Sequence, residues 1–324
     1  MQLPIDMDPI YFDNIYRLKS SEWSQAVFQI CQSLNIEFKS FTSFSDGSNL
    51  VAGVGDSVII KIFPPFHRHQ WESEAKVLHS LLQGELNIPI PNLIGQGELS
   101  GNWTYVVLSR LPGRTIESVW LECSHEEKAS ILKRIGEIMA KVHSVHVGDL
   151  KSLDPKWSEF LNYQIIHCFE RHKKLGMPSW FLKDLKAFVH DSVHLIPEVF
   201  DSVILTGEYT PFNLMTEKQD NKWTVSGMID FGDAMIGFRD YDFLGPSLFL
   251  AGGNADLVRS LFTGYGYSNE NLNAEFRRRL MLLQVLHRYS NFNFQLRIPG
   301  WDKEVRSIEE LERLIWPFSI RITQ

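Results

Sequence analysis

"IEFKSFTSFSDGSNLVAGVGDSVIIKIF", residues 36–63, holds three short strand-like runs in close succession. Residues 36–44 alternate in polarity, residues 50–55 and 57–63 are rich in valine and isoleucine, and "DGSN" at 46–49 is typical of a turn. A parallel pair of strands needs a crossover of a dozen or more residues, so strands this close in sequence pair antiparallel. The stretch predicts an antiparallel meander with 46–49 as a hairpin loop.

Helical periodicity dominates most of the remaining chain. Helices are predicted at 21–34, 69–82, 128–146, 157–173, 179–194, 254–265 and 273–297. The segment 88–98 is predicted to turn, and 103–114 to form a buried strand that breaks at Pro112-Gly113. We therefore expect an α+β fold with a small antiparallel-sheet lobe, 1–110, and a larger, mainly helical lobe, 111–324.

Composition narrows the class of protein. The chain has 324 residues, 44% hydrophobic and 22% charged, which is ordinary for a soluble globular protein. A net charge of −7 argues against a nucleic-acid binder. Cys31, Cys123 and Cys168 are too scattered for a disulfide framework or a zinc site. The N-terminus lacks signal-peptide features and no apolar run approaches the ~18 residues of a membrane span, so we expect a cytoplasmic protein without a membrane partner.

Two polar clusters interrupt the apolar runs of the second half. "VILTGEYTPFNLM" (203–215) contains Thr206, Glu208 and Asn213, and "MIDFGDA" (228–234) places Asp230 after an apolar run. For Asn213 or Asp230 alone, turn formation is the better explanation. Together they offer the hard oxygen ligands that a nucleotide-bound Mg²⁺ takes from proteins. The combination favours a binding site.

Lys61 stands alone among the apolar residues of "SVIIKIF" (57–63). A solvated lysine on an edge strand would explain it, and a lysine directed at phosphates would explain it equally well. The second interpretation requires a carboxylate partner, which the following helix provides as Glu74 or, in a shifted register, Glu72. Such a pair would repeat the strand lysine and helix glutamate with which protein kinases place ATP.

With these motifs in order, the chain resembles the aminoglycoside phosphotransferase and choline kinase-like family, the small-molecule relatives of the protein kinases. "DGSN" resembles the nucleotide-positioning loop, "VIIK" and "ESEAKVL" the lysine strand and glutamate helix, and "VVLSRLPGR" the hinge beside adenine. "TGEYTPFN" resembles the catalytic box, "IDFGDA" the magnesium-binding segment, and "GFRDYDFLGP" the segment that follows it. "RHKKLGMPSWFLKDLKAF" and "GDAMIG" are most similar to hygromycin kinase-like members.

The resemblance implies a protein-kinase-like fold and an enzyme that transfers the γ-phosphoryl group of ATP, with Mg²⁺, to a hydroxyl of a small molecule. It implies that Glu208 orients and deprotonates that hydroxyl, and that Asn213 and Asp230 hold the metal. The implied nucleotide-binding residues are Lys61, Glu74, Ser48, Asn49, Ser109 and Leu111. Asp242 is implied to be a structural residue, and a monomer or weak homodimer is expected.

Two residues depart from the family pattern. Thr206 replaces the usual histidine and Glu208 replaces the usual catalytic aspartate. The longer side chain leaves open a pseudokinase that binds nucleotide without efficient transfer. A protein kinase ranks third, because few residues separate "IDFGDA" from "DYDFLGP". We favour the enzyme, since both implied metal ligands are present. Asp233 could bind a second Mg²⁺, but we interpret it as a turn or cap residue.

The acceptor is the least determined feature. Acidic and basic residues are nearly balanced beyond residue 251, so a carboxylate-rich pocket for a polycation is not evident, although Asp240, Glu159 and Glu170 are candidates to contribute locally. A less charged aminoglycoside-type or sugar-bearing compound is the alternative. His143 and His287 are interpreted as helix packing residues. The C-terminal aromatic residues are expected to lie mostly in the core, with some lining the acceptor pocket: Tyr265, Tyr267, Tyr289, Phe292, Phe294 and Trp301.

Overall fold

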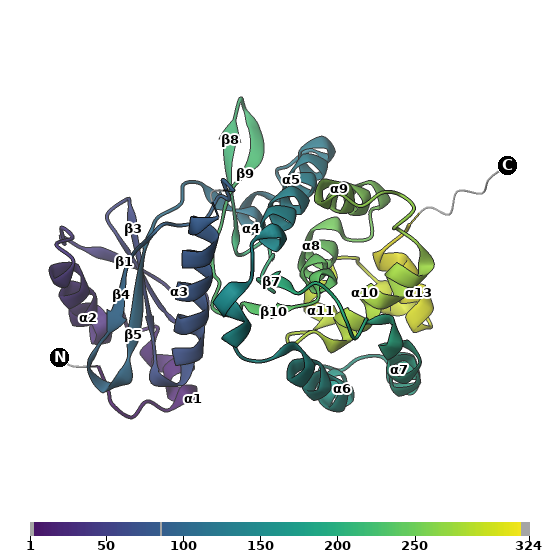
Figure 1. The fold of residues 1–324 in the computed structure, drawn as a ribbon, viewed down its shortest axis with the longest axis horizontal. Coiled ribbons are helices and arrows are strands. Elements are labelled where there is room, and N and C mark those ends of the chain that lie inside the picture. Colours follow the sequence, from purple (N-terminus) through teal and green to yellow (C-terminus); the bar gives the residue numbers. More distant parts are fainter. Residues whose placement is uncertain (1–2, 85, 319–324) are drawn as a thin grey trace. The chain divides into compact units, whose positions relative to one another are not determined.

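The structure, a computed structural model, describes residues 3–84 and 86–318. It contains an antiparallel sheet and a helical body, as predicted (Figure 1). The chain forms two compact units: unit 1 comprises Met1–Pro112 and Gly227–Ala234, and unit 2 comprises Gly113–Ser226 and Met235–Gln324. The segment that carries Asp230 thus packs with unit 1, although it follows most of unit 2 in the sequence.

Unit 1 is built on a five-stranded antiparallel sheet in the order β1-β2-β3-β5-β4. The strands are β1 (Phe41–Phe44), β2 (Leu50–Val54), β3 (Val58–Phe63), β4 (Leu93–Glu98) and β5 (Thr104–Ser109). The predicted meander is confirmed, with 46–49 between β1 and β2. The predicted turn at 88–98 is wrong over β4, an edge strand whose two glycines weaken its local strand signal and whose pairing with β5 decides its structure.

Helices cover both faces of this sheet. The helix α2 (Ser20–Ser33) buries one apolar side against Val58, Ile60 and Ile62 of β3, whose side chains share a face because a strand alternates. The helix α3 (Arg68–Gln83) lies on the other side of the sheet, and Figure 1 shows the sheet between the two helices. Lys61, out of phase with the α2-facing residues, therefore points to the α3 side. A short helix, α1 (Pro9–Tyr11), precedes them.

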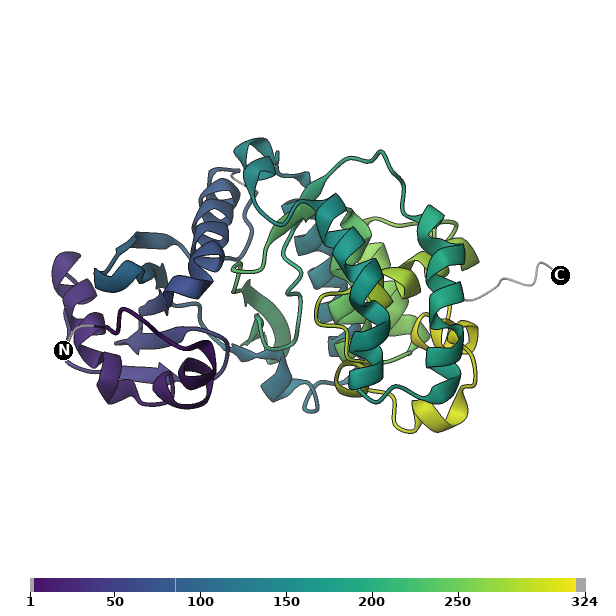
Figure 2. The ribbon, with the colours of Figure 1, turned by 90° about the horizontal axis from the view of Figure 1, so that it is seen from below.

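Unit 2 is mainly helical (Figure 2). Its helices are α4 (Ile116–Val119), α5 (His125–Ser144), α6 (Trp157–Lys174), α7 (Ser179–Ser192), α8 (Leu244–Pro246), α9 (Ala255–Tyr265), α10 (Ala274–Leu286), α11 (Phe292–Gln295), α12 (Trp301–Glu304) and α13 (Ile308–Ile315). Helices α5 and α9 touch backbone to backbone, because a Cβ on Gly136 would lie 2.2 Å from the Leu261 carbonyl oxygen. Within the described ranges, no helix has the length and apolarity required to cross a membrane.

The predicted helix 273–297 is wrong as a single element. It is interrupted at residues 287–291, between α10 and α11. Side chains satisfy the backbone N–H groups freed there: Tyr241 Oη accepts from Arg288, and Gln295 Oε1 accepts from Asn291. Asn291 also caps α11. The Ser290-Asn291 pair was the available sequence signal for this break.

Short strands complete the fold. In unit 2, β7 (Val203–Leu205) pairs antiparallel with β10 (Met235–Gly237). The strands β6 (Arg114–Thr115), β8 (Leu214–Gln219) and β9 (Lys222–Met228) form a three-stranded sheet, and Asp220 and Asn221 make the tight turn between β8 and β9 with positive φ. Residues 206–213 follow β7, and Asp230 follows β9.

Candidate active site

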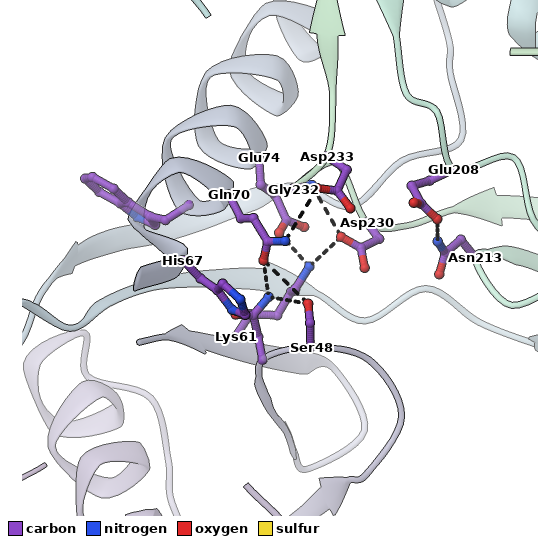
Figure 3. Close-up of polar contacts among 12 residues, drawn as sticks. Ser48, Lys61, His67, Gln70, Glu74, Glu208, Asn213, Asp230, Gly232 and Asp233 are labelled. Atoms are coloured by element: carbon purple, nitrogen blue, oxygen red, sulfur yellow. Dashed lines mark hydrogen bonds and ion pairs between the residues drawn. The ribbon is translucent and has the colours of Figure 1, made fainter. Parts of the chain in front are cut away.

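Lys61 lies between two carboxylates within unit 1 (Figure 3). Its Nζ is 2.5 Å from Glu74 Oε2 and 3.0 Å from Asp230 Oδ1. Lys61 and Glu74 are buried, whereas the Asp230 side chain is 40% exposed. The structure thus brings together three of the predicted residues, from β3, α3 and the turn after β9.

Glu74, not Glu72, is the partner of Lys61. Glu72 lies on the exposed side of α3, where it is within ion-pair distance of Arg68 and Lys76. The alternative register is therefore wrong, because residues two apart on a helix do not share a face.

Burial and neighbouring charges shift the pKa values of this cluster in opposite directions. Burial alone lowers the pKa of Lys61, but the charges of Asp230 and Glu74 outweigh it and the net pKa is raised. Burial raises the pKa of Glu74 to about 7 against the opposing effect of Lys61. Burial also acts to raise the pKa of Asp230, but the charge of Lys61 dominates and lowers it. Lys61 and Asp230 are therefore both charged at neutral pH, and Asp230 presents an anionic oxygen at the exposed edge of the cluster.

The turn after β9 fixes the Asp230 side chain. Asp230 has φ +70°, a left-handed conformation that aspartate tolerates better than most residues. Its Oδ1 accepts from the Gly232 N–H at 3.3 Å as well as from Lys61. The positive φ at a non-glycine residue marks a turn whose shape is held by its surroundings.

A second polar network in unit 1 joins the hairpin loop 46–49 to the 227–234 segment through Gln70 of α3. Gln70 Oε1 accepts from Asn49 Nδ2 at 2.9 Å, and Ser48 Oγ lies 3.5 Å from the same oxygen. Gln70 Nε2 lies 3.5 Å from Asp233 Oδ1, and His67 Nδ1 is 3.0 Å from Asn49 Oδ1. Gln70 was missed from the sequence, although its position one turn before Glu74 places it on the same face of α3.

The predicted hinge follows β5. The Ser109 N–H donates to the Asn92 carbonyl, and the Arg110 N–H donates to the Ser57 carbonyl. No acceptor for the Leu111 N–H lies within the described parts of the chain. Of these three backbone donors, only that of Leu111 lacks an acceptor among the residues that the structure describes.

In unit 2, residues 206–213 are tied down by Asp242. The Thr206 N–H donates to Asp242 Oδ2 at 3.0 Å and the Gly207 N–H donates to Oδ1 at 2.8 Å. Asp242 is buried, and Gly207 has φ +64°, which glycine adopts without strain. This arrangement fits the structural role expected for Asp242.

Glu208 and Asn213 meet inside this loop. Asn213 Nδ2 donates to Glu208 Oε2 at 3.1 Å (Figure 3). The loop is compact, since the Thr210 N–H donates to the Glu208 carbonyl and the Asn213 N–H to the Thr210 carbonyl. The amide nitrogen of Asn213 is thus engaged in a hydrogen bond with Glu208. Asn213 and Asp230 belong to different units, so their joint metal site stays a prediction.

Two residues have other roles than the sequence suggested. His143 of α5 is more than a packing residue: its Nε2 donates to Asp242 Oδ2 at 3.1 Å, and its Nδ1 is 3.0 Å from Tyr265 Oη. Asp240 is buried and bound by Arg279 at 2.8 Å and by the Tyr267 hydroxyl at 3.0 Å. The expectation that Asp240 contributes to an acceptor pocket is therefore wrong, because its charge is already neutralised.

Solved structures with a similar fold are aminoglycoside phosphotransferases. Wild-type aminoglycoside 2'-phosphotransferase-IIIa with GDP is 19% identical, with a TM-score of 0.67 over 90% of this chain and 98% of that chain. The streptomycin-ATP-APH(2")-IIa ternary complex is 15% identical, with a TM-score of 0.57 over 84% and 93%. Aminoglycoside phosphotransferase APH(4)-Ia is 14% identical, with a TM-score of 0.58 over 92% and 99%. At these identities the likeness shows a shared protein-kinase-like fold.

No curated protein matches the sequence. A family model does, over residues 41–278, which is more than half of the chain and includes both the Lys61 cluster and the 206–213 loop. The chain belongs to the phosphotransferase enzyme family and is a small-molecule kinase.

Proposed function

We propose that this enzyme transfers the γ-phosphoryl group of ATP to a hydroxyl of an aminoglycoside-type or sugar-bearing compound. The observation that carries the proposal is the buried lysine of β3 held between Glu74 and Asp230. Phosphoryl transfer depends mainly on positioning and charge stabilisation, and the two carboxylates fix the position of the Lys61 ammonium group. Solved structures with a similar fold include complexes with ATP, ADP and GDP.

Lys61 is proposed to bind the α- and β-phosphates, with Glu74 holding its ammonium group in place. Ser48 and Asn49 are proposed to order the hairpin loop over the nucleotide, through their contacts with Gln70. At the hinge, the Leu111 N–H offers a donor to adenine. Ser109, whose N–H is bound to Asn92, is proposed to border the base.

Asp230 and Asn213 are proposed to supply oxygen ligands to Mg²⁺. Asp230 supplies an anionic carboxylate that is partly exposed, and Asn213 supplies an amide oxygen, since its nitrogen is bound to Glu208. Mg²⁺ in nucleotide sites takes one or two such oxygens and completes its shell with phosphates and water. When bound, the cation neutralises charge on the phosphates.

Glu208 is proposed to orient the acceptor hydroxyl and to accept its proton. The hydrogen bond from Asn213 fixes the direction of the carboxylate, and the Asp242 bonds to Thr206 and Gly207 fix the backbone from which it extends. Because the proton leaves late in a loose transition state, the longer glutamate is suited to the role if the loop positions it correctly. A pseudokinase, favoured only by the glutamate itself, is the second candidate. We further propose a cytoplasmic monomer or weak homodimer.

The first test is thermal melting of the purified protein with ATP or GTP, with and without Mg²⁺, beside Asp230→Asn. A ligand bound only to the native state at a hundredfold excess over Kd stabilises it by about 2.7 kcal/mol. We expect a shift that Mg²⁺ enhances and that Asp230→Asn loses. Phosphoryl transfer should fall on the order of 10²–10³-fold in the same variant.

The matched control is Asp56→Asn, the same substitution at an exposed residue of the β2–β3 turn in unit 1. It should melt and bind as the wild type does. A nucleotide shift indifferent to Mg²⁺ would favour the pseudokinase. Unchanged turnover in Asp230→Asn would refute the proposed role of Asp230.

A further inference from the structure

Two exposed phenylalanines in unit 2 form what we call the aromatic ledge, consisting of Phe212 and Phe294 with the buried Phe249 behind them. The residues Phe212 and Phe294 are 39% and 59% exposed, and their rings lie nearly parallel, with an interplanar angle of 8° and centroids 6.2 Å apart. Each also makes an edge contact with Phe249, at 5.9 and 5.6 Å. Isolated exposed apolar residues are common. Two rings that pack against each other and against a third, buried ring form a surface of fixed shape.

The ledge is continuous with the loop that carries Glu208. Phe212 immediately precedes Asn213, whose side chain binds Glu208. Phe294 is brought there by the break at residues 287–291, since α11 has its own start, capped by Asn291. The backbone under the ledge is further fixed because the Glu117 N–H donates to the Pro211 carbonyl. Phe212 and Glu208 thus belong to one ordered loop of unit 2.

Three carboxylates of unit 2, those of Glu117, Asp240 and Asp242, already have partners. Glu117 forms an ion pair with Arg297 at 2.8 Å, and the Arg297 guanidinium lies over the Phe249 ring. The Asp242 carboxylate is occupied by Thr206, Gly207 and His143. Asp240 is occupied by Arg279 and Tyr267. A polycation is recognised through uncompensated negative charge, and these three carboxylates are compensated.

We propose that the aromatic ledge binds the apolar face of the acceptor, and that the acceptor is a hydroxylated compound with a flat hydrophobic group, such as an aryl-substituted sugar, and little positive charge. This inference rests on the proposed function for the identity of the loop. In this proposal Phe212 and Phe294 determine which acceptor binds, whereas Glu208 acts on the hydroxyl of that acceptor.

The test compares three probes that separate ring stacking from charge: methyl β-D-glucopyranoside, phenyl β-D-glucopyranoside and kanamycin. Binding to the full chain is measured by ligand-observed saturation-transfer NMR with Mg²⁺ and ADP present, without any requirement for turnover. We expect phenyl glucoside to bind more tightly than the other two. Phe294→Ala should weaken its binding about tenfold, which corresponds to about 1.4 kcal/mol.

Phe28→Ala is the matched control, because Phe28 is 40% exposed on α2 and its ring also makes an edge contact with another aromatic residue, Phe38. It should leave the binding of all three probes unchanged. The inference is overturned if phenyl and methyl glucoside bind alike or not at all, if kanamycin binds most tightly, or if the phenyl preference survives Phe294→Ala.

Phosphate transfer to the same probes is measured separately, so that the two proposals fail in different ways. A phenyl preference that depends on Phe294, without any transfer in the presence of ATP, would support the ledge and count against the proposed enzymatic function. Transfer to kanamycin that is unaffected by Phe294→Ala would support the function and overturn the ledge.

Discussion

The Lys61 cluster of unit 1 and the 206–213 loop of unit 2 hold their carboxylates in different ways. In the cluster, one buried ammonium group lies between Glu74 and Asp230, so the geometry depends on which groups are ionised. In the loop, Asp242 accepts from two backbone N–H groups, and Glu208 is directed by a neutral amide. The comparison predicts that the Lys61 cluster is sensitive to charge and pH, whereas the 206–213 loop is sensitive to backbone order.

The largest effect is expected for Glu208→Gln. Removal of a general base lowers kcat by about 10²–10⁴-fold, while the melting shift with ATP and Mg²⁺ should persist because Lys61 and Asp230 are untouched. The measurement is the rate of ATP turnover with and without a panel of hydroxylated acceptors.

Glu208→Asp sharpens this test. If the loop is adjusted to the longer side chain, a displacement of about 1 Å costs on the order of 100-fold in rate. Full turnover in Glu208→Gln would instead indicate that Glu208 takes no proton. A nucleotide-dependent melting shift without any turnover in the wild type would favour the pseudokinase.

Asp242→Asn should have the next largest effect, on stability as well as rate. An amide nitrogen in place of one carboxylate oxygen leaves a buried N–H of Thr206 or Gly207 without its acceptor, which costs about 1–3 kcal/mol. Urea unfolding measures the loss, and amide hydrogen exchange at residues 206–208 should become faster. Asp201→Asn, exposed in the same unit, is the control and should unfold as the wild type does. Wild-type exchange in Asp242→Asn would show that Asp242 does not order the loop.

The smallest effect is a pH dependence carried by Glu74. Burial raises its pKa to about 7, above the ordinary value of about 4.5, so the native state binds this proton more tightly than the unfolded chain does. Its contribution to stability is present below about pH 4.5 and is lost as the pH rises through 7. The unfolding free energy of the wild type relative to Glu74→Gln should therefore decrease between pH 5 and pH 8.

Urea unfolding at several pH values measures this difference, with Glu72→Gln as the control on the exposed side of the same helix. The control should show no such slope. A difference that grows with pH would mean that the ion pair with Lys61 outweighs burial and keeps the native pKa of Glu74 low.

The sheet and most of the helices were predictable because their apolar residues repeat with clear periods of two and 3.6. The Lys61–Glu74 contact was predictable because both residues stand in recognisable motifs, and helical periodicity then separates Glu74 from Glu72. The Gln70 network and the His143–Asp242 bond join residues far apart in the sequence, and no local pattern indicates which of many polar side chains will meet. The break at 287–291 was missed because continuous apolar spacing outweighed the Ser290-Asn291 signal.

Gln70 binds in two directions at once, because its oxygen accepts from Asn49 while its nitrogen faces Asp233. A rotation of the Gln70 amide by 180° would break the contacts with both Asn49 and Asp233. The same side chain therefore orders the hairpin loop and the end of the 227–234 segment. The conformational entropy of these two segments is lost when unit 1 folds and not when a ligand binds. The hairpin loop and the end of the 227–234 segment are therefore preorganised before a ligand binds. One neutral residue outside every recognised motif, Gln70, connects them.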